Sequence, residues 1–203
     1  MTVTSVTCNT RFMTTRTSRR EDLLEASIAY ILQNGVADLS LRPLAAAVGS
    51  KARLLIYHFS SKDALIAEAM TVVRNRVQKA FAEMVGSTTQ RKPEQVLRAF
   101  WAWATSHDHE SYLRLFFEVH GLALQKPAQY GSYLEGAVSS WVDMLTRVLP
   151  QNVPASRRRA VATLLVATAV GLLLDYLSSG DKKRVTQSLD LFLANTGNWL
   201  ALG

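Results

Sequence analysis

The sequence predicts an all-α protein: an N-terminal three-helix helix-turn-helix head, joined by a long helix to a larger helical body. Apolar residues recur at helical spacing along most of the chain, and no stretch shows the alternation of a strand. Breakers at Gly49, Pro150 and Gly180 separate these segments. With 203 residues, 48% of them hydrophobic, the chain can fill a sizeable core. We expect the head at residues 18–65 and the body at residues 66–203.

Residues 1–17 differ from the rest in being rich in threonine and in lacking a helical period. We expect them to form a mobile N-terminal arm. The first residues also lack the apolar core of a signal peptide, which predicts a cytoplasmic protein. The single cysteine, Cys8, excludes an intramolecular disulfide and fits a reducing compartment.

The first helix is expected to begin near Ser18 and to end at Gly35. Glu21 and Asp22 lie in its first turn, where negative charge is favourable. Apolar residues at helical spacing predict that this helix supports the two short helices that follow it.

Two short helices are predicted on either side of Gly49, in the run LRPLAAAVGSKARLLIYHF that spans residues 41–59. Ser40 can cap the first, and Pro43 lies in its first turn, where a missing N–H group costs nothing. In the second, the spacing of Leu54, Leu55 and Phe59 directs these side chains inward. Its basic residues are left on the outer face, as in a helix-turn-helix.

Positive charge lies at helix starts in this region. Lys51 and Arg53 fall in the first turn of one helix and Lys62 in the first turn of the next, where each opposes the helix dipole by up to about 1 kcal/mol. A bound polyanion would offset this cost, and the net charge of +7 also favours an anionic partner. The alternative is that these are ordinary solvated charges.

The run from Arg20 to Met70 resembles the N-terminal DNA-binding domain of TetR-family transcriptional regulators. The matching features are a first helix ending in Asn34-Gly35, the run LSLRPLAAAVG, a second short helix ending in Tyr57-His58-Phe59, and the helix start Ser61-Lys62-Asp63-Ala64-Leu65.

The resemblance implies a set of DNA-binding residues by position. Those expected to contact phosphates or bases are Ser40, Arg42, Lys51, Ala52, Arg53, Ile56, Tyr57, His58 and Lys62. It also implies a double-stranded DNA operator, a homodimer and a small-molecule effector bound by the C-terminal body.

A long helix is predicted from Lys62 towards Val85, because apolar residues follow a near-3.6 spacing without a break. Its length of about 36 Å allows it to belong to both head and body. Ser60 and Asp63 fit a capping box at its start. Further helices are predicted around residues 94–106, 112–124, 133–149, 156–177 and 182–200.

Aromatic residues are concentrated in the body, and their polar tips favour a small-molecule pocket over plain core packing, which is the alternative. The candidate ligand-binding residues are Trp101, Phe116, Phe117, His120, Tyr130, Tyr133 and Trp141.

The last two predicted helices have apolar faces that need cover, which predicts a four-helix dimer interface. Its candidate residues are Leu165, Thr168, Leu172, Leu189, Phe192 and Trp199. A membrane span is the weaker alternative, because the apolar run at residues 160–174 falls short of the roughly 20 residues required.

Other functions are less consistent with this sequence. A metal-dependent enzyme using His107 and His109 is disfavoured, because residues two apart on a helix point in different directions and no third ligand is evident. No P-loop, nucleophile elbow or GxGxxG occurs, so we expect no enzyme, metal or cofactor. A helical adaptor that binds an acidic protein is the main alternative. We expect a repressor that leaves a pseudo-palindromic operator when an effector binds.

Overall fold

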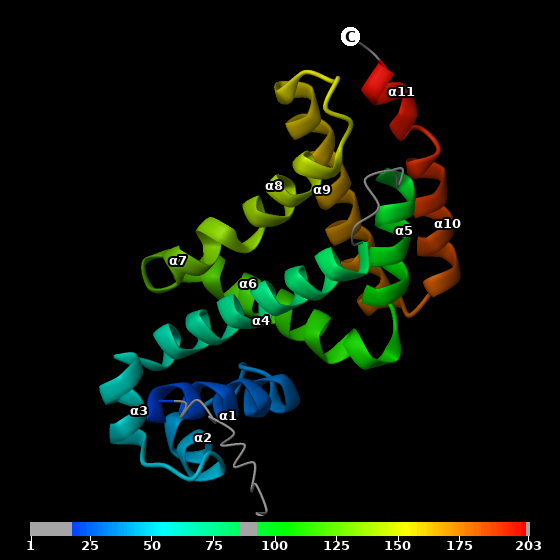
Figure 1. The fold of residues 1–203 in the computed structure, drawn as a ribbon. Helices are drawn as coiled ribbons and strands as arrows, with labels where there is room; N and C mark the ends of the chain where they lie inside the picture. The colour runs from blue at the N-terminus through cyan, green and yellow to red at the C-terminus, as the bar shows by residue number, and fades with distance from the viewer. Residues whose placement is uncertain (1–17, 86–92, 202–203) are drawn as a thin grey trace, which may run out of the picture.

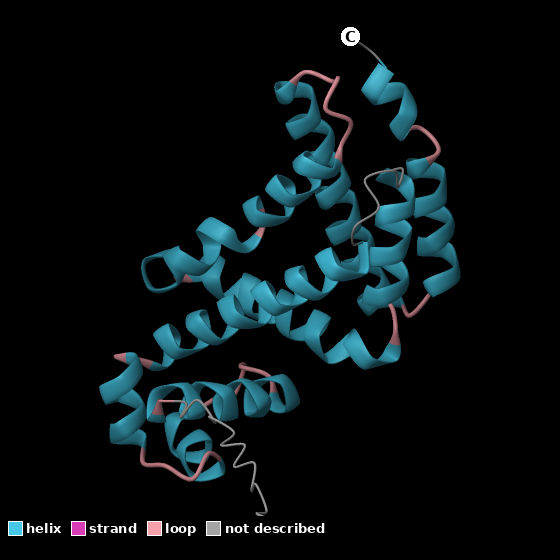
Figure 2. Cartoon of the chain, in the orientation of Figure 1, coloured by secondary structure: helices cyan, strands magenta, loops and turns pink. Residues whose placement is uncertain are grey.

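The computed structural model describes residues 18–85 and 93–201, and within them every regular element is helical (Figure 2). This confirms the predicted all-α class. The predicted arm at residues 1–17 lies outside the described residues. The head consists of α1 (Arg19–Asn34), α2 (Leu41–Ala47) and α3 (Ala52–Phe59).

The helices of the head begin and end for local reasons. Ser18 and Glu21 form a capping box at the start of α1, and the left-handed Gly35 (φ 73°) ends it. Gly49 (φ 63°) makes the turn between α2 and α3. The predicted helix-turn-helix geometry is therefore present.

The long helix α4 (Lys62–Val85) leads from the head into the body (Figure 1). The capping box predicted from Ser60 and Asp63 is wrong. Ser60 adopts a positive φ of 67° at the end of α3, and the hydroxyl that accepts from the backbone N–H of Ala64, at 3.0 Å, belongs to Ser61. The Asp63 carboxylate instead contacts the body.

The body contains the remaining helices. They are α5 (Pro93–Ala104), the 3₁₀ helix η1 (His107–His109), α6 (Glu110–Gln125), α7 (Pro127–Ala137), α8 (Ser139–Val148), α9 (Ala155–Ser179), α10 (Lys182–Leu193) and α11 (Thr196–Ala201). Two predicted helices are each divided: 133–149 breaks near Val138, and 182–200 breaks after α10.

Two hydrophobic clusters form the core, and α4 belongs to both. The first cluster runs from the head through Met70 to Val119 and Tyr133 of α6 and α7. The second contains Phe81 of α4 and the facing sides of α5, α8, α9 and α10. The head thus shares its core with α6 and α7, and the predicted boundary at residues 65 and 66 lies within the first cluster.

Helix α9 is long and apolar enough to cross a membrane, with a mean hydropathy of 2.0 over its most apolar window. It packs against α8, α10 and α11 (Figure 1). Core helices of soluble proteins share this length and composition, so this helix alone is weak evidence for a membrane span.

Candidate nucleic-acid interface and body cavity

Helix α3 is divided into an inner and an outer face. Leu55 and Phe59 are 1% and 4% exposed and fix the helix to the core of the head. Arg53 and Tyr57 lie on the opposite face, where Tyr57 is 78% exposed. Burial of the apolar face therefore forces the basic and aromatic residues outward.

The predicted DNA-binding residues lie together on α2, α3 and the helix starts beside them. Those exposed to solvent are Ser40, Arg42, Lys51, Arg53, Ile56 and Tyr57, and those half-buried are Ala52, His58 and Lys62. The first group is free to reach an external partner, whereas the second is partly committed to packing.

A hollow on this surface is lined by Lys51, Arg53 and Tyr57 together with Arg19 at the start of α1. The Arg19 guanidinium donates to the carbonyl of Gly49 at 3.5 Å. Sequence reasoning missed Arg19, because only the packing of α1 on the α2–α3 turn brings it here. Three cations on one concave face create an attractive site for an anion.

Lys62 differs from the other cations. Its ammonium donates to the backbone carbonyl of Leu39 at 2.8 Å, which ties the start of α4 to the loop before α2. Lys62 therefore stabilises the fold of the head, although its position at a helix start opposes the helix dipole. Among the described residues, Arg42, Lys51 and Arg53 make no ion pair or side-chain hydrogen bond.

Arg20 of α1 joins this helix to α4 and to the end of α3. Its guanidinium makes paired hydrogen bonds of 2.7 and 2.6 Å with the carboxylate of Glu68 and lies 4.8 Å from the ring centre of Phe59. The hydrogen bond with Glu68 raises the pKa of Arg20. This contact holds the inner end of α3 against α4.

Polar contacts also join the body to the head. The Glu118 carboxylate of α6 accepts from the backbone N–H groups of Val36 and Ala37, at 3.0 and 2.5 Å. The Tyr130 hydroxyl of α7 donates to Asp63 at 3.0 Å; burial and this hydrogen bond raise its pKa. Both contacts lie close to the starts of α2 and α4. A movement of α6 or α7 would therefore shift or break contacts that hold these two helix starts.

A cavity of about 60 Å³ lies inside the body between α4, α5, α6, α7, α8 and α9. Among its described lining residues are Phe81, Phe100, Phe116 and Trp141, and none of the lining residues carries a charge. Some of the aromatic residues that are concentrated in the body thus line a cavity.

Of the predicted ligand-binding residues, the structure brings only Phe116 and Trp141 to the cavity. Trp101 is 4% exposed and its indole N–H donates to Thr186 at 2.9 Å. The others that do not line the cavity are Phe117, His120, Tyr130 and Tyr133. Their placement on the lining is corrected, because successive helical residues differ by about 100° in direction.

Comparison with known proteins identifies the head. Residues 23–69 match the family model of bacterial regulatory proteins, tetR family. Residues 23–69 are therefore a DNA-binding domain of the tetR family, and the chain is a DNA-binding transcriptional regulator and not an enzyme. No curated protein matches it by sequence.

Solved structures share the fold over nearly the whole chain. A TetR transcriptional regulator from Legionella pneumophila has a TM-score of 0.69 at 17% identity, covering 89% of this chain and 97% of that one. A transcriptional regulator from Rhodococcus sp. Rha1 has a TM-score of 0.67 at 20% identity, with 87% and 95% covered. The multidrug binding protein EbrR complexed with proflavin has a TM-score of 0.60 at 22% identity, with 85% and 98% covered.

Two of the predicted dimer-interface residues are wrong. Leu165 and Leu189 are 0% and 1% exposed inside the protomer's own core, so they have no surface to offer a partner. The others, Thr168, Leu172, Phe192 and Trp199, are half-buried. The exposed large hydrophobic residues of α9 and α10 are Leu164, Leu174 and Leu191.

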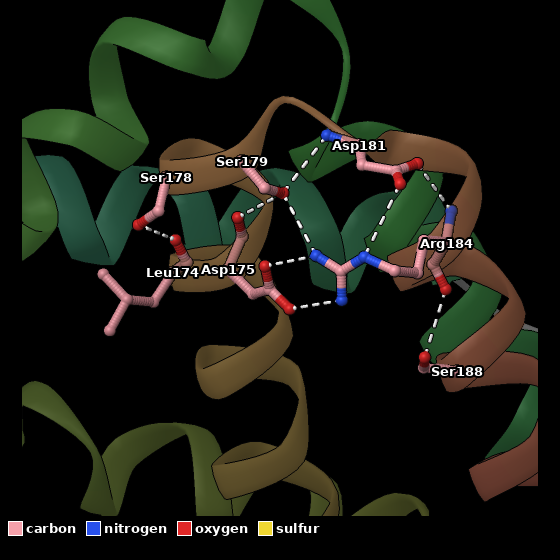
Figure 3. A network of polar contacts seen from close by, with 7 residues as sticks. All are labelled: Leu174, Asp175, Ser178, Ser179, Asp181, Arg184 and Ser188. Atoms are coloured by element: carbon pink, nitrogen blue, oxygen red, sulfur yellow. Dashed lines mark hydrogen bonds and ion pairs between the residues drawn. The ribbon is translucent and has the colours of Figure 1, made fainter.

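The turn from α9 to α10 is fixed by charge (Figure 3). Arg184 makes hydrogen bonds of 2.9 and 2.6 Å to Asp175 and also pairs with Asp181. The contact with Arg184 lowers the pKa of Asp175, and the contact with Asp175 raises that of Arg184. These bonds set the relative position of the two helices expected to dimerise.

The histidine cluster serves the connection between α5 and α6. The ring of His109 lies 4.0 Å from that of Trp103, and its Nδ1 lies 2.7 Å from the Ser106 hydroxyl oxygen, while His107 is exposed. Within residues 18–85 and 93–201 no group of three or more potential metal ligands is found. The cluster therefore has a local structural explanation.

Proposed function

We propose that this regulator is a homodimeric, ligand-responsive repressor that acts in the cytoplasm on a pseudo-palindromic operator. The observation that carries the DNA-binding part is the group of exposed cations on α2 and α3 that have no partner in the described protomer. Leaving them unpaired adds nothing to folding, whereas duplex phosphates and base edges would pair with them. The division into an arm, a head at 18–65 and a body at 66–203 is part of the proposal.

In this proposal α3 enters the major groove. Lys51 and Arg53 contact base edges, and Ala52 and Ile56 lie beside them. Phosphates are contacted by Ser40, Arg42, Tyr57, His58 and Lys62, to which the structure suggests adding Arg19. Lys62 keeps two N–H donors for a phosphate while one holds Leu39.

The proposed dimer forms through an exposed stripe of α9. Ala160, Leu164, Ala167, Gly171 and Leu174 are all exposed and follow one another at alternating steps of four and three residues. This is the spacing of a helix–helix seam, and the small residues allow close approach. Leu191 of α10 is 72% exposed and is a further apolar residue that a partner can cover. A second copy of the chain covers such a surface by two-fold symmetry.

The proposed response to ligand depends on the size of the cavity. A space of about 60 Å³ is far below the 300 Å³ or more of typical ligand pockets, so a ligand must push the lining apart. Phe116 lines the cavity, and Glu118, on the same helix, holds the loop before α2. Displacement of α6 would then loosen the head and change the spacing of the two recognition helices.

The test is binding to the DNA beside the chain's own gene across a salt series. A regulator should prefer one palindromic site over random duplex by roughly 10³ or more and should lose affinity steeply with salt. An adaptor for an acidic protein would show no preference between sequences, and that result would reject the proposal.

A further inference from the structure

Three buried polar atoms without a hydrogen-bond partner occur close together in the body. They are Arg74 Nε on α4, His120 Nδ1 on α6 and the Tyr133 hydroxyl on α7. A buried polar group without a partner costs roughly 1–3 kcal/mol, and such groups are uncommon in folded proteins. Several at one place indicate a site that is completed by another molecule.

These residues are direct neighbours. The Arg74 guanidinium donates to the backbone carbonyl of Tyr133 at 3.4 Å, and the rings of His120 and Tyr133 lie 6.3 Å apart. The guanidinium also packs against Gly136, where an added Cβ would lie 2.7 Å from Arg74 Nη1. The absence of a side chain at Gly136 therefore makes room for the cation.

This polar group adjoins the apolar cavity. Phe116 lines the cavity and stacks on His120 at 5.6 Å between ring centres, and Ala137, the residue after Gly136, is also part of the lining. Tyr112, another lining residue, is close enough to Arg74 for the charge to act on its hydroxyl. The cavity is thus apolar, and the group of Arg74, His120 and Tyr133 lies just beyond one side of its lining, which we call its polar end.

The polar end is positively charged. Arg74 forms no ion pair with any described residue, whereas Arg20 and Arg76 on neighbouring surfaces are paired with Glu68 and Glu25. Burial lowers the pKa of His120 and raises that of Tyr133 to about 12, so neither adds charge near pH 7. No acidic residue belongs to the described lining.

We propose that the cavity binds a monoanionic amphiphile, with an apolar body among the aromatic rings and one carboxylate paired with Arg74. The inference rests on the proposed function, in which this cavity is the effector site. A guanidinium can bind a carboxylate through two parallel hydrogen bonds, and the hydroxyls of Tyr112 and Tyr133 can donate to the same group. A cationic ligand would meet the unpaired charge of Arg74 without compensation.

The matched probes are octanoate, octanol and octylammonium, which share one tail and differ in head group. Binding is followed by intrinsic tryptophan fluorescence, to which Trp141 of the cavity lining contributes, and by the shift in melting temperature. Octanoate should bind at least about tenfold more tightly than octanol, with octylammonium weakest. Equal binding of octanol, preferred binding of octylammonium, or no binding of octanoate would overturn the proposal; equal binding of octanol would mean that an ordered water satisfies the polar end.

Variants on α4 isolate the contribution of Arg74. Arg74→Gln should weaken octanoate by about tenfold or more and leave octanol within about twofold, and Arg74→Lys should retain part of the preference. Arg76→Gln removes a charge two residues away that is already paired with Glu25, and it should change the binding of neither ligand. If Arg74→Gln and Arg76→Gln reduce octanoate binding alike, the effect is one of overall charge and the site is wrong.

The same samples separate this inference from the proposed function. Binding of octanoate that depends on Arg74 but leaves operator affinity unchanged would uphold the ligand chemistry and reject the ligand response. Release of the operator by octanol or octylammonium, with no binding of octanoate, would uphold the ligand response and reject the proposed ligand chemistry.

Discussion

The head and the body of this protein differ in how many of their surface cations form ion pairs. In the body, several surface arginines are paired: Arg98 with Asp190, Arg159 with Asp143, and Arg184 with Asp175. On the outer face of the head, Lys51 and Arg53 have no such partner among the described residues. Exposed pairs contribute little stability, so the contrast concerns what each surface is free to bind.

Arg74 is the informative exception. It belongs to α4, which serves both regions, and it is half-buried without an acidic partner. We propose that the unpaired cations on the head's surface and Arg74 beside the cavity each pair with an anion supplied from outside, which is duplex DNA for the head and a small carboxylate for the cavity.

The largest loss of operator affinity is expected from disrupting the proposed dimer interface of the body, because the dimer links the two DNA-binding heads. Gly171→Arg places a long charged side chain on the exposed stripe of α9, where an added Cβ meets nothing within 4 Å in the protomer. The variant should fold, remain monomeric by light scattering and lose roughly 100-fold or more in operator affinity, because two linked heads bind as one. Ala80→Arg, on an exposed face of α4, is the control. A dimeric Gly171→Arg would show that the interface lies elsewhere.

The next effect tests the unpaired cations of the head. Arg53→Ala should weaken the operator by about 1–3 kcal/mol if the guanidinium makes a bidentate contact with guanine, and should weaken random duplex less. Fluorescence anisotropy with both duplexes measures the difference. Arg98→Ala removes a paired arginine of the body and should alter neither. Equal losses on both duplexes would make Arg53 a phosphate contact.

A smaller effect is expected at the contact between the regions. Glu118→Ala leaves the N–H groups of Val36 and Ala37 without their acceptor, so the free energy of unfolding should fall by about 1–3 kcal/mol. If α6 transmits the ligand signal, operator affinity without ligand should fall as well. Urea denaturation and anisotropy measure the two quantities, with the exposed Glu135→Ala as control. Unchanged operator affinity despite lower stability would exclude Glu118 from signal transmission.

The smallest effect is a dependence of stability on pH. Burial lowers the pKa of His120 in the folded protein, so the unfolded chain binds more protons once the pH falls below about 6.5. This contribution to stability is full above that pH and is lost progressively below it. Urea denaturation from pH 8 to pH 5 should therefore show a decline that is reduced in His120→Gln. The exposed His107→Gln should keep it, and a decline unchanged by His120→Gln would place its origin in another group.

Much of the head could be predicted from the sequence because its signals are local. Ser18 and Glu21 cap α1, Gly49 makes the turn, and apolar spacing turns Leu55 and Phe59 inward. The same spacing leaves Arg53 and Tyr57 outside, so the composition of the outer face follows from the sequence. The placement of Arg19 beside them does not, since it depends on how α1 packs on α2 and α3.

The body shows the limit of such reasoning. Helical periodicity indicates that a residue faces something, but not whether it faces its own core, a cavity or a partner. Periodicity therefore predicts Leu165 and Leu189 at the dimer interface although both lie inside the protomer, and it predicts Tyr133 at the ligand site although Tyr133 is not part of the cavity lining.

The sequence by itself determined the all-α class, the helix-turn-helix and the basic outer face of α3, because each depends on residues a few positions apart. Only the tertiary structure decided the partners of Lys62, Glu118 and Arg74. Glu118 and Val36 are 82 positions apart, and contacts at such separation depend on how whole helices pack. The same packing left Arg74 without an acidic partner beside an apolar cavity, a property that no local pattern encodes.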